Sequence, residues 1–216
     1  MRYICRKQIK KIPMKAKIVK FGPFLKLWIP VIGCIALSSC WPCNTTVIDN
    51  GPLPDSALIF VPYIDGQTYS FKHSNGLVID FSATRKTHAE WSGCSECCEY
   101  EYHYEVNTTL LTSEYPVFDM FFRIDNMNAP YYHCSAAIGK YGFYIPTYNI
   151  IGNAEYEQVD SIAVDSTWYY KVFKLKADNL MFLPHDSIFV DSLYYSYNDW
   201  VIKIIMSNGE NYVLQQ

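Results

Sequence analysis

Residues 99–106 alternate strictly between two kinds of side chain. Three glutamates and His103 occupy every second position, and three tyrosines and Val106 occupy the positions between them. Successive side chains of a β-strand point to opposite faces, so this spacing gives one polar and one aromatic face. A helix would mix both kinds on each side. The segment therefore predicts a strand with one face packed and one face in water.

Similar patterns continue along most of the chain. In residues 117–124, Phe118, Met120, Phe122 and Ile124 occupy every second position. No stretch of a dozen residues keeps the apolar stripe of a helix. Asp65-Gly66, Asn198-Asp199 and Asn208-Gly209 are turn signals. Further strands are expected at 58–63, 67–72, 77–85, 132–138, 142–146, 161–164, 168–176, 187–195, 200–207 and 211–214. We predict an all-β fold over residues 57–216, a single antiparallel domain of about nine to eleven strands forming a sandwich or a curled open barrel.

The first 39 residues differ from this region in charge. They hold nine basic residues and no acidic one, and an uncharged apolar run at 27–37 follows the last lysine. Eleven helical residues span about 16 Å, too short for a bilayer core of about 30 Å. The pattern is typical of a secretory signal peptide, with translation starting at Met1 or Met14.

The apolar run ends at Leu37-Ser38-Ser39-Cys40. This sequence resembles the lipobox of bacterial lipoproteins, and the resemblance implies cleavage after Ser39 and a lipid-modified, palmitate-bearing Cys40. Several acyl chains would make the membrane anchor effectively permanent. Trp41 rather than aspartate follows, which in the family favours the outer membrane. Residues 40–56 contain three prolines and a glycine, so we predict a lipidated tether there.

The residues after position 39 carry nine basic and all twenty-one acidic groups, a formal charge of −12. Such a domain is a poor partner for nucleic acid, which requires clustered cations. Catalytic and phosphate-binding motifs such as Gly-x-Ser-x-Gly, His-Glu-x-x-His and Gly-rich loops are missing from the sequence, so we name no catalytic residue and expect no cofactor.

The C-terminal third resembles a module found in small, mostly uncharacterised exported lipoproteins of Gram-negative bacteria. The matching segments are 169–173, 191–195, 201–204, 207–210 and 212–214. The resemblance implies a terminal hairpin and a lipoprotein context, and it implies no activity. The family usually has glycine in the turn before the Val-Ile run. This chain has Trp200 there, which predicts a looser turn.

Five cysteines remain after cleavage besides Cys40. Cys94, Cys97, Cys98 and Cys134 are disulfide candidates in an oxidising compartment, for example Cys94 with Cys97 and Cys98 with Cys134, leaving Cys43 unpaired. A metal site formed by Cys94, Cys97, Cys98 and His103 is the alternative, because thiolate and imidazole are ligands that zinc prefers. Two further alternatives are redox chemistry at the Cys-x-x-Cys sequence and cysteines that remain free thiols.

Three functions fit these features. The first is a lipid-anchored envelope protein, a binding or structural module that contacts an envelope protein or a glycan. The second is a carrier that encloses an apolar ligand in a barrel cavity of several hundred Å³. The third is a metal or thiol protein that uses the loop from Cys94 to Cys98. All three place the protein at a membrane of the cell envelope.

Overall fold

A computed structural model of the chain describes residues 45–93, 100–115, 117–147, 156–179 and 188–215. Residues 44–216 form one compact unit. The predicted signal peptide (1–39) and Cys40 lie outside the described residues. Within the described ranges, no helix has both the length and the apolar character that a membrane span requires.

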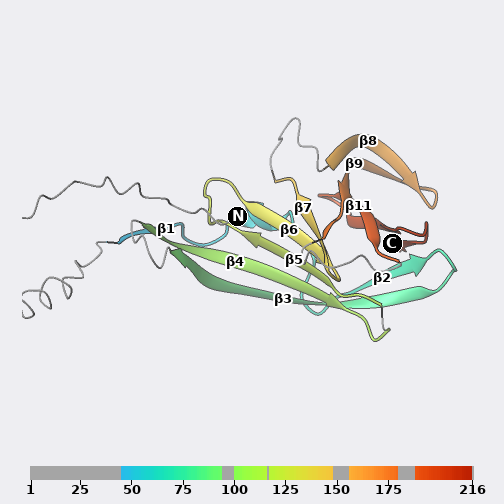
Figure 1. Cartoon of the computed structure of the whole chain (residues 1–216), viewed down its shortest axis with the longest axis horizontal. Coiled ribbons are helices and arrows are strands. Elements are labelled where there is room, and N and C mark those ends of the chain that lie inside the picture. The colour runs from blue at the N-terminus through green and yellow to red at the C-terminus, as the bar shows by residue number, and fades with distance from the viewer. Residues whose placement is uncertain (1–44, 94–99, 116, 148–155, 180–187, 216) are drawn as a thin grey trace, which may run out of the picture. The chain divides into compact units, whose positions relative to one another are not determined.

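The described residues of this unit form one continuous β-sheet (Figure 1). Its strands are β1 (Thr46–Asp49), β2 (Thr68–His73), β3 (Val78–Gly93), β4 (Tyr100–Thr112), β5 (Met120–Asp125), β6 (His133–Ile138), β7 (Tyr141–Ile145), β8 (Tyr156–Val164), β9 (Thr167–Lys176), β10 (Asp178–Asn179), β11 (Val190–Ser196), β12 (Trp200–Met206) and β13 (Asn211–Leu214). They are ordered β10-β7-β6-β5-β4-β3-β2-β13-β12-β11-β9-β8, and β1 pairs in parallel with β4.

The prediction of a single antiparallel β domain is confirmed. Without parallel β1 and the two-residue β10, eleven antiparallel strands remain among the described residues, which is the upper end of the expected number. The last hairpin, β12 with β13, is the one that the C-terminal resemblance implied. The sheet curls so that β7 approaches β9, and most of its apolar side chains lie on the inner face.

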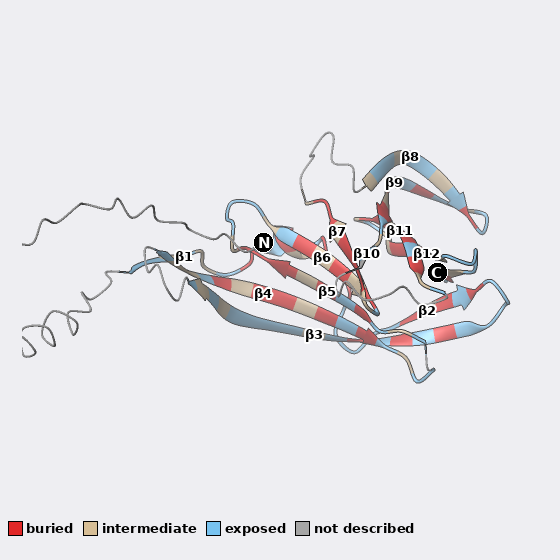
Figure 2. Cartoon of the chain, in the orientation of Figure 1, coloured by how far each residue is buried: buried red, intermediate tan, exposed pale blue. Residues whose placement is uncertain are grey.

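Alternation determines which side chains reach this interior, as the buried and exposed bands of the strands show (Figure 2). On β5, Met120, Phe122 and Ile124 are fully buried, in the predicted phase, whereas Phe121 is 39% exposed. Strand β4 is buried in the same way toward its end, where Leu111 is enclosed. The inner face is therefore the core, and the outer face carries the residues that can meet a ligand.

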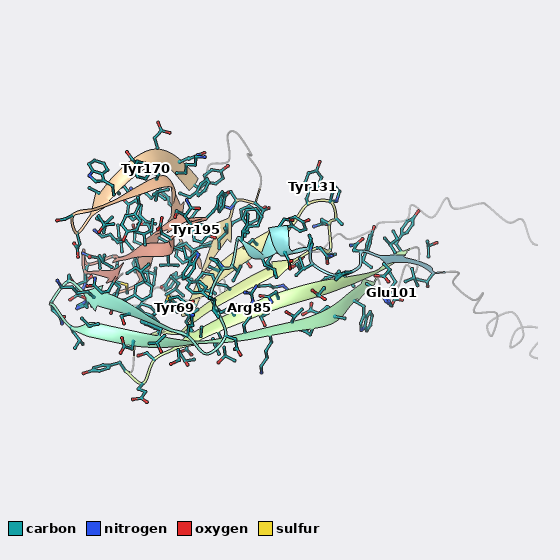
Figure 3. The ribbon with its side chains drawn as sticks, turned by 180° about the vertical axis from the view of Figure 1, so that it is seen from behind. Tyr69, Arg85, Glu101, Tyr131, Tyr170 and Tyr195 are labelled. Carbon is teal, nitrogen blue, oxygen red and sulfur yellow. The ribbon has the colours of Figure 1, made fainter. Side chains whose placement is uncertain are left out.

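The interior of the curled sheet is occupied by the plug, which we define as residues 53–63. The prediction of a strand at 58–63 is wrong, because this segment contains the end of helix α2 (Asp55–Leu58) and then irregular backbone. Ala57, Val61 and Tyr63 of the plug are at most 1% exposed. The plug is also held to the sheet by a hydrogen bond, since the Tyr195 hydroxyl donates to the Phe60 carbonyl at 2.5 Å (Figure 3).

The residues ahead of the plug also belong to the domain. Within the predicted tether, β1 pairs with β4 from Thr46↔Tyr100 to Asp49↔His103. The Asn50 side chain donates to the carbonyls of Asn126 and Met127, at 2.9 and 2.8 Å. The folded domain therefore extends at least to Thr46.

Strand β9 contributes to two cores because the alternation of its side chains shifts by one residue at Lys171. This residue has a φ of +53°, a left-handed conformation that shifts the strand. Before it, Tyr169 packs in a second cluster on the reverse side of the sheet with Ile202 and Val213. After it, Phe173 and Leu175 face the main core.

The turn before β12 is closed rather than loose. The Asp199 backbone N–H donates to the Ser196 hydroxyl at 2.9 Å, and Trp200 follows with a φ of +67°. That conformation favours glycine over a residue with a side chain. The Trp200 ring lies 5.2 Å from the rings of both Tyr63 and Tyr69, and this aromatic packing offsets the backbone strain.

Candidate functional site

A charged network crosses the outer face of β3, β4, β5 and β6. Both terminal nitrogens of Arg123 donate to the Glu90 carboxylate, at 3.1 and 2.8 Å, and the Arg123 Nε donates to Asp125 at 3.1 Å. Asp125 also lies 3.5 Å from Nδ1 of His133, and Glu90 accepts from the Tyr104 hydroxyl. The register produces this cluster, because Asp125 is opposite His133 and Glu90 is opposite Tyr104.

The network keeps both carboxylates ionised. Hydrogen bonds from Arg123 hold the pKa of Glu90 below its ordinary value. Burial acts to raise the pKa of Asp125, but hydrogen bonds from His133 and Arg123 outweigh it and the pKa is lowered. The carboxylates therefore fix Arg123 and His133 in place.

Beside this network lies an open groove of about 700 Å³ on the outer face of β5, β6 and β7, which we call the groove. Its lining side chains include Phe121, Tyr144, His133 and Ser135, with Lys176 and Asp178 beyond β7. The register explains the hollow: Phe121 is opposite Ala137, Ala137 is opposite Gly142, and Gly142 is opposite Asp178. Small residues thus form the floor between larger ones.

The groove offers binding groups of several kinds. Phe121 presents an exposed ring, the Ser135 hydroxyl can donate and accept, and Lys176 and Asp178 carry opposite charges. Ser135, His133 and Asp125 share one face, but among the described residues Ser135 makes no hydrogen bond with His133. The groove therefore lacks the nucleophile–base contact of a hydrolytic triad in the described state.

A second hollow, of about 640 Å³, lies over the outer face of β2, β3 and β4. Hydroxyl and acidic residues line it, among them Thr68, Ser82, Thr112, Asp80 and Glu114. Its lining includes Tyr115 but no basic residue. It offers fewer kinds of contact than the groove.

Of the predicted site residues, only Cys134 and His103 lie among the described residues. Cys94, Cys97 and Cys98 lie outside the described residues, so their pairing stays a prediction. Cys134 has no disulfide partner among the described residues and is fully buried beneath the plug, with its Sγ 3.9 Å from the Phe60 carbonyl. His103 contacts Glu101 at 2.8 Å, and no three metal-ligating side chains gather among the described residues.

The groove and the network were not predicted from the sequence, although one signal was present. The inward phase of residues 118, 120, 122 and 124 places Phe121, Arg123 and Asp125 on the outer face. This phase places one aromatic ring and two charged side chains side by side on the outer face. Their partners, Glu90 and His133, follow only from strand pairing.

Comparisons of the chain with protein-family models, with curated proteins and with solved structures gave no match.

Proposed function

We propose that this protein is an exported lipoprotein, held to an envelope membrane through Cys40, that binds an envelope glycan in the groove. The leader and the Leu37-Ser38-Ser39-Cys40 sequence support the anchor. The single observation that carries the binding function is the groove itself, with an exposed aromatic ring beside a floor of small residues.

The chemistry of the groove favours a sugar over other ligands. A pyranose has an apolar face that suits the Phe121 ring and hydroxyls that suit Ser135, Lys176 and Asp178. The volume of about 700 Å³ lies in the range of small-ligand sites. A stable protein partner would cover about 800 Å² on each side. The surface beside the groove is instead taken up by the paired charges of the Glu90–Arg123 network.

The other two hypotheses receive less support. Ala57, Phe60, Val61 and Tyr63 pack against the inner face of the sheet, where a carrier would hold its ligand. The metal or thiol hypothesis depends on Cys94, Cys97 and Cys98, which lie outside the described residues. Neither gains an observation that favours it over glycan binding.

Binding can be tested on the purified protein with an oligosaccharide array followed by calorimetric titration of the best ligand. Phe121→Ala should weaken the affinity by about tenfold or more, or ~1.4 kcal/mol, because it removes the stacking ring. Tyr170→Ala is the matched control, since Tyr170 is 62% exposed on β9, outside the groove. The proposal fails if no oligosaccharide binds, or if both variants bind like the wild type.

The anchor needs its own experiment. Cys40→Ala should move the protein from the membrane fraction to the soluble fraction, and intact-mass analysis of the wild type should show a chain that begins at acylated Cys40. Continued membrane retention of Cys40→Ala, or an unmodified full-length chain, would contradict lipidation.

A further inference from the structure

The paired ends of β1, β3 and β4 form an arm that has no apolar core. We define the arm as Thr46–Asp49 with residues 88–93 and 100–105 (Figure 1). Residues 86–93 of β3 are exposed or half-buried on both faces, unlike residues 79–83, which alternate with the core (Figure 2). The β3 part of the arm therefore meets solvent on both faces, and in the β4 part only Tyr104 is buried.

Large apolar side chains are nevertheless exposed at its end. Trp91 is 71% exposed, the highest value among the exposed large hydrophobic residues of the described chain, and Tyr100 and Val47 are 52% and 54% exposed. Trp91 is opposite His103 and so shares the face of Glu101, whereas Tyr100 follows the opposite phase. The exposed rings thus lie on both sides of the ribbon.

The anchor brings this end close to lipid. Cys40 precedes Thr46 by six residues, which span at most about 22 Å at ~3.6 Å per residue. Thr46 is opposite Tyr100 in the parallel pair, so β1 starts at the same end of the arm as β4. The arm end is therefore the part of the described domain to which the anchor is joined.

We propose that the end of the arm contacts the membrane surface, with Trp91 and Tyr100 at the level of the lipid headgroups. Tryptophan and tyrosine favour this interface because their rings are apolar while their N–H and O–H groups stay hydrated. This inference rests on the proposed anchor at Cys40. It adds an orientation, in which the domain stands end-on and the groove lies along the side of the sheet.

The distribution of side chains favours a lipid surface over a protein partner. A protein that docks on a ribbon covers one of its faces. The exposed rings of the arm lie on both faces, and this distribution suits insertion of the arm end into the membrane–water interface. The acidic groups near the arm end offer no attraction to anionic lipid, because carboxylates carry the same sign of charge; Glu101 contacts His103 at 2.8 Å, and Asp49 accepts from the Gly51 backbone N–H. The contact is therefore hydrophobic and interfacial rather than electrostatic.

Tryptophan quenching by brominated lipid tests the contact. The lipidated protein is reconstituted into phosphatidylcholine vesicles with and without lipid brominated near the headgroup end of its acyl chains. All variants carry Trp41→Phe, because Trp41 adjoins the lipidated residue and would be quenched in any case. In this background Trp91 should be quenched, and adding Trp91→Phe should abolish most of the quenching.

The matched control is Trp168→Phe in the same background, since Trp168 is 61% exposed but lies on β9. This control should retain the full loss of emission caused by the brominated lipid. Both tryptophans are on the surface, so neither change should alter the thermal unfolding midpoint. If the lipidated protein floats with the vesicles but Trp91 is not quenched, the arm contact is overturned and the anchor stands. If intact mass shows no lipid on Cys40, the anchor itself is overturned, and the arm contact with it.

Discussion

Arg123 on β5 reaches across β4 and places two N–H groups on the Glu90 carboxylate of β3, at 3.1 and 2.8 Å. The same guanidinium contacts Asp125 of β5, so one cation fixes two carboxylates on two strands that are separated by β4. Its side chain is 28% exposed, and the pairing is therefore only partly screened by solvent.

This pairing predicts a specific sensitivity to acid. Arg123→Ala should lower the free energy of unfolding by about 1–2 kcal/mol at pH 7, because two ionised carboxylates lose their partner. The pKa values of Glu90 and Asp125 lie below their ordinary values of 4.5 and 3.8, so their contribution is present above those values and lost as the pH falls below them. Urea unfolding at pH 7 and at about pH 3.5 should show a smaller acid loss in Arg123→Ala than in the wild type. Lys86→Ala, which removes an exposed cation of β3, is the control; equal acid losses in all three proteins would contradict the prediction.

The left-handed conformation of Trp200 predicts that glycine at this position gives a more stable protein than alanine does. Replacing Trp200 removes its contacts with Tyr63 and Tyr69 and should cost about 3 kcal/mol or more. Glycine relieves the strain at φ +67° and alanine does not, so Trp200→Gly should be more stable than Trp200→Ala by about 1 kcal/mol. Ordinary strand positions show the reverse order. Denaturant midpoints of the two variants measure the difference, and a more stable alanine variant would contradict the strain argument.

Cys134 should resist alkylation while the domain is folded. Its thiol is fully buried, and burial raises its pKa well above the ordinary value, so little thiolate is available to react. Peptide mass mapping after iodoacetamide treatment at pH 8 should find Cys134 unmodified in the native protein and modified in urea. Equal labelling in both conditions would contradict its burial. A linked pair of peptides containing Cys98 and Cys134 would instead support the predicted bridge.

The contact between Tyr195 and the plug predicts a loss of stability from a very small change. Tyr195→Phe removes only the hydroxyl that donates to the Phe60 carbonyl and should destabilise the fold by about 1–3 kcal/mol, because that acceptor stays buried. Tyr170→Phe is the control, since the Tyr170 ring is 62% exposed. Thermal unfolding compares the two, and equal midpoints would show that the hydroxyl does not hold the plug.

The strands could be predicted where alternation was regular and turn residues marked both ends. Residues 211–214 coincide with β13. The strand predicted at 99–106 lies in β4 over its described residues, and β4 continues to Thr112. The plug was missed because Leu58, Ile59, Phe60 and Val61 are apolar in succession, a run that fits a buried strand as well as it fits an irregular segment enclosed on all sides.

The groove was beyond prediction for a different reason. Phe121, Ser135 and Tyr144 lie on three strands, and only the pairing of β5, β6 and β7 brings them together. Periodicity assigns a face to each residue but does not give the register between strands, which depends on contacts distant in sequence. The Glu90–Arg123 contact, 33 residues apart in the chain, illustrates the same limit.

The position of the plug also determines when the domain can close as it folds. Phe60 and Tyr63 are synthesised early, yet they are held by Tyr195 and Val201, residues 135 and 138 positions later. A fragment that ends before β11 therefore lacks two of the hydrogen bonds that hold the plug. Contacts this distant slow folding. The plug is thus secured only once the final strands have been made, so a chain truncated ahead of β11 leaves Phe60 and Tyr63 without these partners.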